Sequence, residues 1–396
     1  MNSNYVTYKL GDITELVIDY RGKTPKKLGS DWATTGYRAL SAKNIKTGKI
    51  VQEESIRFVN EELYKLWMKE EVKRGDILIT SEAPFGQIYF WDSDEKIVLS
   101  QRLYCLRLKK NVSALYVYYY MCTIPFQKEL AARATGTTVI GLRQAELLNC
   151  EIKLPPLPIQ QKISNILYNL DKYIKLNEQK NKLLEELAKT IFSKLFNEST
   201  NNFEELRNYI SIKHGYAFSG QGITTNDNGF SLVTPGNFKI GGGFKNYKNK
   251  FFKDDFPSTY ILKPNDLIVT MTDLSKDGDT LGYGALVPLF SDTKFLHNQR
   301  IGLVIFNNDL LNKDYLYWFM RSYSYQKTVL GSSSGSTVRH TSPDRILDIK
   351  IKLPSQNLEY INKLTAIDYE IEVNNYEIEN IEKLRDLLLQ KLLTCN

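Results

Sequence analysis

The stretch that decides the fold runs from Pro155 to Phe196 and reads PPLPIQQKISNILYNLDKYIKLNEQKNKLLEELAKTIFSKLF. Its prolines end whatever element precedes them, because proline lacks an N–H and its ring blocks a helix. After Pro158 this stretch contains no further proline or glycine. Residues then recur at alternating steps of four and three, which is the seam of a heptad helix. The predicted seam consists of Ile163, Leu167, Leu170, Ile174, Asn177, Asn181, Leu184, Ala188, Ile191 and Leu195. At 1.5 Å per residue the helix would be roughly 55–60 Å long.

A second heptad helix closes the chain, 197 residues after the first (374 − 177 = 197). Its predicted seam includes Tyr360, Leu364, Ile367, Ile371, Asn374, Ile378, Ile381, Arg385, Leu388 and Leu392. Asn177 and Asn374 occupy equivalent seam positions, and a buried Asn fixes register because it needs a polar partner. If the two helices pack antiparallel about a pseudo-twofold axis, we expect these asparagines to meet. The alternative is that each is a solvated edge residue.

The charges of the two predicted helices are complementary. Residues 159–196 carry seven lysines and four acidic residues, a net charge of +3, whereas residues 358–396 carry four basic and eight acidic residues, a net charge of −4. Opposite charge favours pairing of the two helices with each other over self-pairing. The contribution of such surface pairs to stability is small.

Composition sets the remaining limits. The chain has 396 residues, 42% hydrophobic residues and a net charge of +7, which allows two or three domains and is compatible with nucleic-acid binding. No signal sequence or long apolar run is visible, so we expect a cytoplasmic protein with no membrane partner. Four scattered cysteines without CxxC spacing predict reduced thiols. No nucleotide-binding motif, metal-ligand cluster or catalytic constellation is found, so no catalytic or metal-binding residue is predicted.

The chain is an internal repeat of roughly 195 residues. Seven segments recur in the same order: YRGKTP (20–25) and HGYAF (214–218), GYRALSAKNI (36–45) and GFSLVTPGNF (229–238), GDILIT (75–80) and NDLIVT (265–270), SQRL (100–103) and NQRI (298–301), YVYYYM (116–121) and YLYWFM (315–320), TGTTV (135–139) and SGSTV (334–338), IKLP (152–155) and IKLP (351–354). No single match is specific, but their common order and near-constant offset are. Within the first unit, DILIT predicts a buried strand. Residues 113–134 predict one helix whose tyrosines line the core with their hydroxyls at its rim.

Two variable α/β units, each followed by IKLP and a long heptad helix, resemble the specificity subunits of type I restriction-modification enzymes. The resemblance covers essentially the whole chain, although the second helix begins with PSQNLEYI (354–361) in place of the proline-rich PIQQ segment. It implies an α/β (α+β) fold with two pseudo-twofold-related target recognition domains separated by two long antiparallel coiled-coil helices. The expected division is 1–153 and 201–352 for the recognition domains, and 154–200 and 353–396 for the spacer helices.

The resemblance also implies the function. Each recognition domain would read one half of a bipartite target in double-stranded DNA, and the helices would set the spacing. The chain would be non-catalytic and hold no cofactor. It would recruit two methyltransferase subunits that use S-adenosylmethionine and, in a complete enzyme, restriction subunits that use ATP and Mg²⁺. Two rival hypotheses remain open: a stand-alone nuclease or fused restriction-modification enzyme, and a coiled-coil adaptor that binds only protein.

Basic, hydroxyl-bearing and glycine-rich loops suit contacts to phosphates and are the candidates for DNA binding. In the first unit they are Arg21, Lys23, Thr24, Lys26, Lys27, Lys43, Asn44, Gln101, Arg102, Arg133, Thr135, Thr137, Thr138 and Arg143. In the second unit they are Lys213, His214, Tyr216, Asn237, Gln299, Arg300, Ser333, Ser334, Ser336, Thr337, Arg339 and His340. The recurring Gln–Arg pairs suit adenine and guanine. Because both units share them, a structural or phosphate-binding role is the stronger interpretation.

Overall fold

The computed structural model describes residues 5–136, 140–199, 202–246, 250–273, 275, 277–335, 338–354 and 358–393. The chain divides into two compact units. Unit 1 comprises Met1–Ile174 with Ile381–Asn396, and unit 2 comprises Lys175–Asn380. Each unit therefore holds one globular part together with a portion of both long helices. The four-part division expected from the sequence stays a prediction, because compactness groups each helix portion with the globular part that it packs against.

Unit 1 is built on a four-stranded antiparallel sheet in the order β2 (Thr14–Asp19), β10 (Leu103–Leu108), β7 (Ile77–Thr80) and β8 (Ile88–Phe90). The predicted strand in DILIT is confirmed as β7, in which all four residues are buried. A second sheet has the order β6 (Arg57–Val59), β3 (Tyr37–Leu40) and β9 (Ile97–Leu99), with β3 parallel to β9. Two small pairs complete it: β1 (Val6–Lys9) with β11 (Glu151–Leu154), and β4 (Ile45–Lys46) with β5 (Lys49–Ile50).

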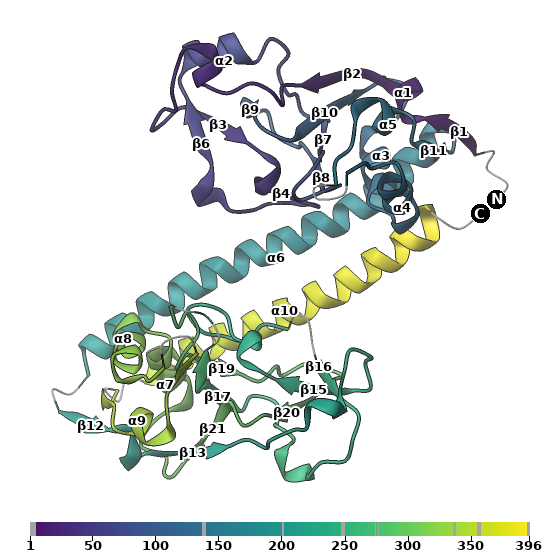
Figure 1. Ribbon diagram of the computed structural model, residues 1–396. Helices are drawn as coiled ribbons and strands as arrows, with labels where there is room; N and C mark the ends of the chain where they lie inside the picture. The colour runs from purple at the N-terminus through teal and green to yellow at the C-terminus, as the bar shows by residue number, and fades with distance from the viewer. Residues whose placement is uncertain are drawn as a thin grey trace. The chain divides into compact units, whose positions relative to one another are not determined.

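Unit 2 repeats this plan, which confirms the predicted internal repeat (Figure 1). Its main sheet has the order β13 (Ile210–His214), β21 (Ile301–Phe306), β17 (Leu267–Thr270) and β19 (Gly284–Leu286). Its second sheet has the order β14 (Ile223–Thr224), β16 (Lys250–Phe252), β15 (Phe230–Val233) and β20 (Lys294–His297), again with one parallel pair, β15 and β20. β12 (Phe203–Glu205) pairs with β23 (Lys350–Lys352), and β18 (Thr272–Asp273) with β22 (Arg339–His340).

Short helices pack beside the sheets. They are α1 (Leu10–Ile13), α2 (Glu61–Trp67), α3 (Ala114–Met121), α4 (Ile124–Ala132) and α5 (Gln144–Leu148) in unit 1, and α7 (Lys313–Met320), α8 (Tyr323–Ser332) and α9 (Pro343–Leu347) in unit 2. The single helix predicted for residues 113–134 is wrong. It is divided into α3 and α4, because Pro125 lies in a first turn, where its missing N–H costs nothing. The predicted core position of the tyrosines is confirmed: Tyr116, Tyr118 and Tyr119 are buried.

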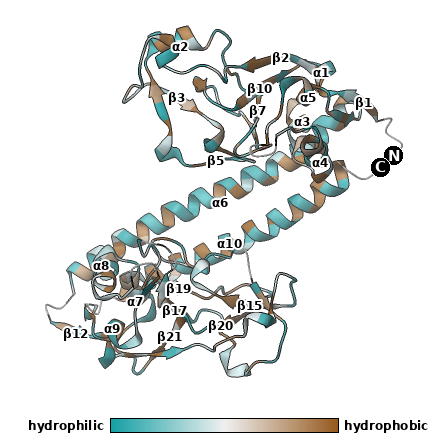
Figure 2. Ribbon diagram, viewed as in Figure 1, coloured by the Kyte–Doolittle hydropathy of each residue, from teal (hydrophilic) through white to brown (hydrophobic). Residues whose placement is uncertain are grey.

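The two long helices are α6 (Leu157–Asn197) and α10 (Leu358–Leu393). In unit 1, Arg385 Nη1 of α10 donates to Asp171 Oδ1 of α6 over 2.9 Å. In unit 2, Asn181 of α6 bonds to Asn374 and Asn375 of α10, and Lys194 lies over the ring of Tyr360. Residue numbers rise along α6 as they fall along α10, so the predicted antiparallel pairing is confirmed. Figure 2 shows both helices banded by alternating apolar and polar residues.

The predicted seam residues are all buried or partly buried. Many of them also belong to the cores of the globular parts. Ile163 and Leu167 join the core of unit 1, and Leu195, Leu364 and Ile367 join the core of unit 2. The heptad pattern therefore serves two packing surfaces, one on the other helix and one on the globular part.

The predicted meeting of Asn177 with Asn374 is wrong. Asn374 Nδ2 donates instead to Asn181 Oδ1 over 2.7 Å. Asn177 lies four residues, about one helical turn, before Asn181. Its side chain is 8% exposed, and its amide nitrogen has no partner within the described part of the chain. Both asparagines are buried, but the register of the antiparallel pair places them one turn apart.

Candidate nucleic-acid interface

One edge of the main sheet in unit 1, the edge at which β2 and β7 end and β10 begins, carries candidate residues from segments that are distant in the sequence. β2 and β7 both run antiparallel to β10, so their last residues, Asp19 and Thr80, lie opposite Tyr104 and Leu103 at the start of β10. The turns at this edge carry Arg21, Ser81–Glu82 and Gln101–Arg102. Ser81 N donates to Arg102 O over 2.9 Å, which ties two of these turns together.

A third segment joins the same edge through the backbone. Leu142 N donates to Ser81 O over 2.9 Å, and Thr135 pairs with Gly141 in an isolated bridge. Thr135, Gly141 and Leu142 are therefore held beside the other two turns. Candidate residues predicted from three separate motifs lie around one end of one sheet.

Unit 2 builds the same framework with different side chains. Met271 N donates to Arg300 O over 3.0 Å, and Thr341 N donates to Met271 O over 3.0 Å. Ser334 and His340 form the matching bridge. Its glycine, Gly335, has φ +96°, and a Cβ there would strike the carbonyl oxygen of Val338. The matching Gly136 of unit 1 has φ +119°, so the sequence match TGTTV/SGSTV reflects a turn that requires glycine.

Three of the four candidate arginines of unit 1 are paired with a carboxylate. Arg21 binds Asp19 through Nε and Nη2, both over 2.9 Å, and its guanidinium lies 4.0 Å from the ring centroid of Tyr104. Arg102 Nε lies 3.2 Å from Glu82 Oε1. The third, Arg133, donates from Nε to Glu129 Oε1 over 3.1 Å and also lies near Glu146. Partial burial lowers the pKa of Arg21, but the hydrogen bond to Asp19 and the charges of Tyr104, Asp19 and Glu82 together raise it above its usual value.

The lysines of the loop that follows β2 are used partly to hold that loop. Lys23 Nζ donates to Trp67 O over 2.8 Å and lies over the ring of Tyr20, and burial together with nearby Lys69 lowers its pKa. Lys27 Nζ donates to the carbonyl of Gly22 over 2.9 Å, and its backbone N–H bonds to Thr24 Oγ1 over 3.3 Å. Lys26, in the 3₁₀ turn η1 (Lys26–Leu28), has an exposed side chain.

Asn44 and Asn237 are corrections to the predicted DNA-binding set. Asn44 is 1% exposed, and its Oδ1 accepts from the N–H and hydroxyl of Ser41. Asn237 is 4% exposed and does the same with Thr234. Each is the last residue of a 3₁₀ turn, η2 (Ala42–Asn44) or η6 (Pro235–Asn237), and its side chain forms a capping box with the residue that precedes the turn. Both side chains make their hydrogen bonds within the local structure. The spacing Ser/Thr-x-x-Asn is the sequence signal that indicates this role.

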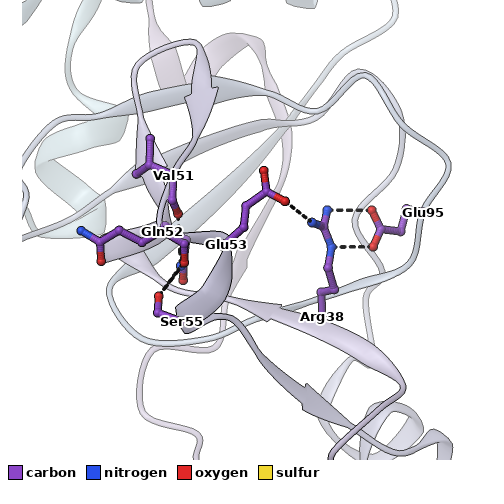
Figure 3. A network of polar contacts seen from close by, with 7 residues as sticks. Arg38, Val51, Gln52, Glu53, Ser55 and Glu95 are labelled. Atoms are coloured by element: carbon purple, nitrogen blue, oxygen red, sulfur yellow. Dashed lines mark hydrogen bonds and ion pairs between the residues drawn. The ribbon is translucent and has the colours of Figure 1, made fainter. Parts of the chain in front are cut away.

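The amide of Asn44 also fixes the next turn, η3 (Glu53–Ser55). Its Nδ2 donates to Gln52 O over 3.2 Å and to Ser55 Oγ over 3.1 Å, and Ser55 Oγ donates to Gln52 O over 2.7 Å. Figure 3 shows this turn beside Arg38, which binds Glu95 through two hydrogen bonds and also lies near Glu53. The network holds Gln52 at φ +52°, a conformation that is uncommon for a residue other than glycine.

In unit 2 two candidates, Lys213 near the end of β13 and Tyr216 just after that strand, belong to an aromatic cluster. Lys213 and His214 are exposed, and Lys213 Nζ lies 5.0 Å from the ring centroid of Tyr260. The ring of Tyr216 packs against Phe218 and Tyr260 with centroids 5.1 and 5.2 Å apart. The positive charge of Lys213 therefore lies above an aromatic ring, whereas Arg21, Arg102 and Arg133 of unit 1 lie beside carboxylates.

The remaining candidates lie around the same two sheet edges. Arg339 Nη1 donates to Ser333 Oγ over 3.3 Å, and His340 Nδ1 lies 3.1 Å from Thr272 Oγ1. Candidates with exposed side chains at these edges are Gln101, Arg102, Thr135, Arg143, Gln299, Arg300, Ser334 and His340. Thr137, Thr138, Ser336 and Thr337 lie outside the described residues.

The sequence reasoning missed the residues that orient the candidate arginines. Asp19, Glu82 and Tyr104 hold Arg21 and Arg102 in place. The only local signal is the spacing Asp19-x-Arg21 at the end of a strand. The partnership of Glu82 with Arg102 depends on the strand register and has no local signal.

A family model described as the type I restriction modification DNA specificity domain matches residues 2–186 and, a second time, residues 199–383. The chain belongs to this family. It is a type I specificity subunit with two target recognition domains, and both matched regions extend from a globular part into a long helix. No helix in the described residues is both long and apolar enough to cross a membrane.

Relatives from the archaeon Methanocaldococcus jannaschii agree with this assignment. The chain is 23% identical over 410 residues to the type I restriction enzyme MjaVIII specificity subunit, covering 98% of this chain and 91% of that one. It is 24% identical over 349 residues to the MjaIX specificity subunit, covering 81% and 77%. Its fold is similar to the crystal structure of a type I restriction-modification S subunit from M. genitalium, with a TM-score of 0.66, 15% identity and coverage of 100% and 97%.

Proposed function

We propose that each unit reads one half of a bipartite target in double-stranded DNA, through the edge of its main sheet described above. The observation that carries the proposal is the repeated framework. In both units the same two backbone hydrogen bonds join three candidate loops, while the side chains on those loops differ. A common scaffold with different side chains suits two half-sites of different sequence.

The exposed basic residues supply the contacts to phosphates. Lys26, Lys43 and Arg143 in unit 1, and Lys213 and Arg300 in unit 2, have exposed side chains. Contacts to phosphates release counterions, so binding to DNA should weaken as salt rises. A protein-only adaptor would show no such DNA binding, which separates it from the proposed function.

The long helices set the distance between half-sites and dock the methyltransferase subunits. In unit 2, α6 exposes Leu176 (54%), Leu183 (65%) and Leu187 (50%), which lie seven and four residues apart on one side of the helix. Such an apolar stripe on a charged helix suits the apolar face of a partner helix. The partner proposed for it is a methyltransferase subunit, and a restriction subunit joins in a complete enzyme.

The chain itself is non-catalytic in this proposal. The methyltransferase subunits hold S-adenosylmethionine, and the restriction subunits use ATP and Mg²⁺. The functional division follows the sequence, with residues 1–153 and 201–352 as the recognition domains and residues 154–200 and 353–396 as the spacer helices. A stand-alone enzyme would instead cut or methylate DNA when the purified chain is given Mg²⁺ or S-adenosylmethionine.

Exchanging residues 1–153 for those of a relative tests the proposal. The whole complex should then methylate a site in which one half has changed and the other half is retained. Methylation patterns read by sequencing give both halves at once. A change in both halves, or in neither, would contradict the assignment of one half-site to each unit.

Insertion of one heptad at matched positions of both helices should lengthen the spacer, and an unaltered spacer would refute the role of the helices.

A further inference from the structure

Arg21 is held in a way that sets it apart from the other exposed basic residues of unit 1. Asp19 accepts hydrogen bonds from its Nε and Nη2, and its backbone N–H donates to the same carboxylate over 3.1 Å. The ring of Tyr104 supports the flat face of the guanidinium, and its own hydroxyl donates to Leu142 O over 3.0 Å. Asp19 and Tyr104 therefore fix the position and the plane of the guanidinium, although the side chain of Arg21 is still 34% exposed.

The bonds to Asp19 leave one edge of the guanidinium available. Arginine has five N–H donors, and Asp19 takes one from Nε and one from Nη2. Both protons of Nη1 and the outer proton of Nη2 remain, and the outer protons of Nη1 and Nη2 lie side by side on an edge that Asp19 does not occupy. No described residue accepts a hydrogen bond from Nη1. Two parallel N–H groups on this edge match O6 and N7 of guanine in the major groove.

We propose that Arg21 reads a guanine in the half-site bound by unit 1, with Asp19 and Tyr104 acting as positioning residues. This inference rests on the proposed function and adds the base and the residue. A phosphate is the weaker partner for Arg21, because the adjacent carboxylate of Asp19 repels an anion and offsets the charge of the guanidinium. Arg143 and Lys43, which are exposed, suit phosphates better.

Unit 2 lacks this arrangement at the equivalent place. By strand register, His214 lies opposite Gly302 as Asp19 lies opposite Tyr104. His214 has no carboxylate where unit 1 has Asp19, and Gly302 has no ring where unit 1 has Tyr104. The guanine reader is therefore specific to unit 1, and the half-site of unit 2 serves as an internal control in every experiment.

The test uses the complete complex of the chain with its methyltransferase subunits on a library of random DNA. Sequencing the methylated molecules gives the preference at each position of both half-sites, and the domain exchange described above shows which half belongs to unit 1. Three variants are compared with the natural chain: Arg21→Lys, Asp19→Asn and Arg74→Lys. Arg74 is the matched control, because it is also forked by a carboxylate, Asp94, but lies at the opposite end of β7.

Arg21→Lys should lower the preference for guanine at one position of the unit 1 half-site by about 5- to 150-fold, the range for one bidentate contact. Asp19→Asn should lower it less, at the same position. Arg74→Lys should leave both half-sites unchanged. If Arg21→Lys abolishes selection altogether, Asp19→Asn separates the two explanations. A lower guanine preference at that one position in Asp19→Asn indicates a reading role for Arg21, whereas an unchanged preference indicates that Arg21→Lys does not fold.

Three results would overturn the inference. The first is a natural half-site for unit 1 without guanine. The second is an unchanged guanine preference in both Arg21→Lys and Asp19→Asn. The third is uniformly weaker binding to all sequences with a salt slope lower by about one, which marks a phosphate contact. A natural complex that selects no bipartite sequence would instead refute the proposed function itself.

Discussion

Asn374 Nδ2 donates a hydrogen bond to Asn181 Oδ1 over 2.7 Å, from one long helix to the other. Two further bonds close this polar layer. Lys180 Nζ donates to Asn374 Oδ1 over 3.2 Å, and Asn181 Nδ2 donates to Asn375 Oδ1 over 3.0 Å. The oxygen and the nitrogen of both amides, Asn181 and Asn374, are therefore hydrogen-bonded, within a seam that is mostly apolar. A satisfied polar layer of this kind fixes register, because any shift of the helices leaves its groups unpaired.

The first prediction concerns this layer. Asn374→Leu should destabilise the protein by about 1–3 kcal/mol, because it removes a buried amide and leaves the partly buried amide oxygen of Asn181 without its donor. The double variant Asn181→Leu/Asn374→Leu should recover much of that loss, since both polar groups are removed together. Chemical denaturation of the two single variants and the double variant gives the coupling energy, expected at about 0.5–3 kcal/mol. Additive effects would show that the bond between the two asparagines contributes nothing.

Asn177 provides the second prediction, with the opposite sign. It is buried on the same seam, but its amide nitrogen has no partner in the described residues. An unpaired buried donor costs about 1–3 kcal/mol, so Asn177→Leu should raise stability and the melting temperature. The comparison with Asn374→Leu is direct, since the two positions are equivalent in sequence. Destabilisation by Asn177→Leu would mean that this amide does have a partner in solution.

These two asparagines also show how far the sequence could lead. The heptad spacing predicted both long helices and their pairing, because an apolar period repeated over many turns leaves few alternatives. The register could not be predicted from that spacing, because a shift of one turn keeps every apolar residue on the seam. Register is decided by the polar layer around Asn181 and by packing of each helix against a globular part. Neither is visible in a periodic pattern.

The candidate interface followed the same division. The repeat located the loops that carry Arg21, Arg102 and Arg133, since loops with matched offsets mark matched positions. It could not identify their partners: Glu82 meets Arg102 only through the strand register. Asn44 was misassigned because the residue type alone does not show whether an asparagine is exposed or is buried in a capping box. Its spacing from Ser41 was the signal that separates them.

The third prediction concerns the pH dependence of unit 2. Trp318 Nε1 donates to Asp368 Oδ2 over 3.0 Å, just as Tyr119 donates to Asp171 over 2.7 Å in unit 1. Asp171 also has an ion pair with Arg385, whereas Asp368 has no ion pair within the described part of the chain. Burial, reinforced by nearby Asp314, raises the pKa of Asp368 well above its usual value. Among its other neighbours, Arg321 opposes this shift and Glu372 adds to it.

The sign of the effect follows from proton binding. Between the pKa of an unfolded Asp, about 3.9, and the raised folded value, the native state holds a proton that the unfolded chain has released. Stability therefore falls as pH rises through this window. Asp368→Asn keeps the acceptor for Trp318 and removes the titration, so it should stabilise the protein by more than about 1 kcal/mol at pH 8, with the gain vanishing near pH 4. Denaturation at several pH values measures this.

The matched control for Asp368 is its counterpart in unit 1. Asp171→Asn should destabilise the protein at pH 8, because it removes the charged partner of Arg385, which is itself partly buried. A loss of stability in Asp368→Asn at pH 8, similar to that of Asp171→Asn, would show that Asp368 is ionised and stabilising in the native state. That result would contradict the raised pKa.

The fourth prediction separates two neighbouring residues, Lys43 and Asn44. Asn44→Ala breaks the capping box of the 3₁₀ turn, leaves the backbone N–H of Ser41 without its acceptor and removes the hydrogen bonds from Asn44 to Gln52 and Ser55. A loss of about 2–3 kcal/mol in stability is expected, since several buried groups are affected at once.

Lys43→Ala should leave stability within about 0.5 kcal/mol, because its side chain is exposed. In the complete complex it should weaken DNA binding for all sequences alike and lower the salt slope by about one. Denaturation curves and salt titrations of both variants measure these effects. Loss of stability in Lys43→Ala, or a stable Asn44→Ala variant with weakened DNA binding, would reverse the roles assigned to the two side chains.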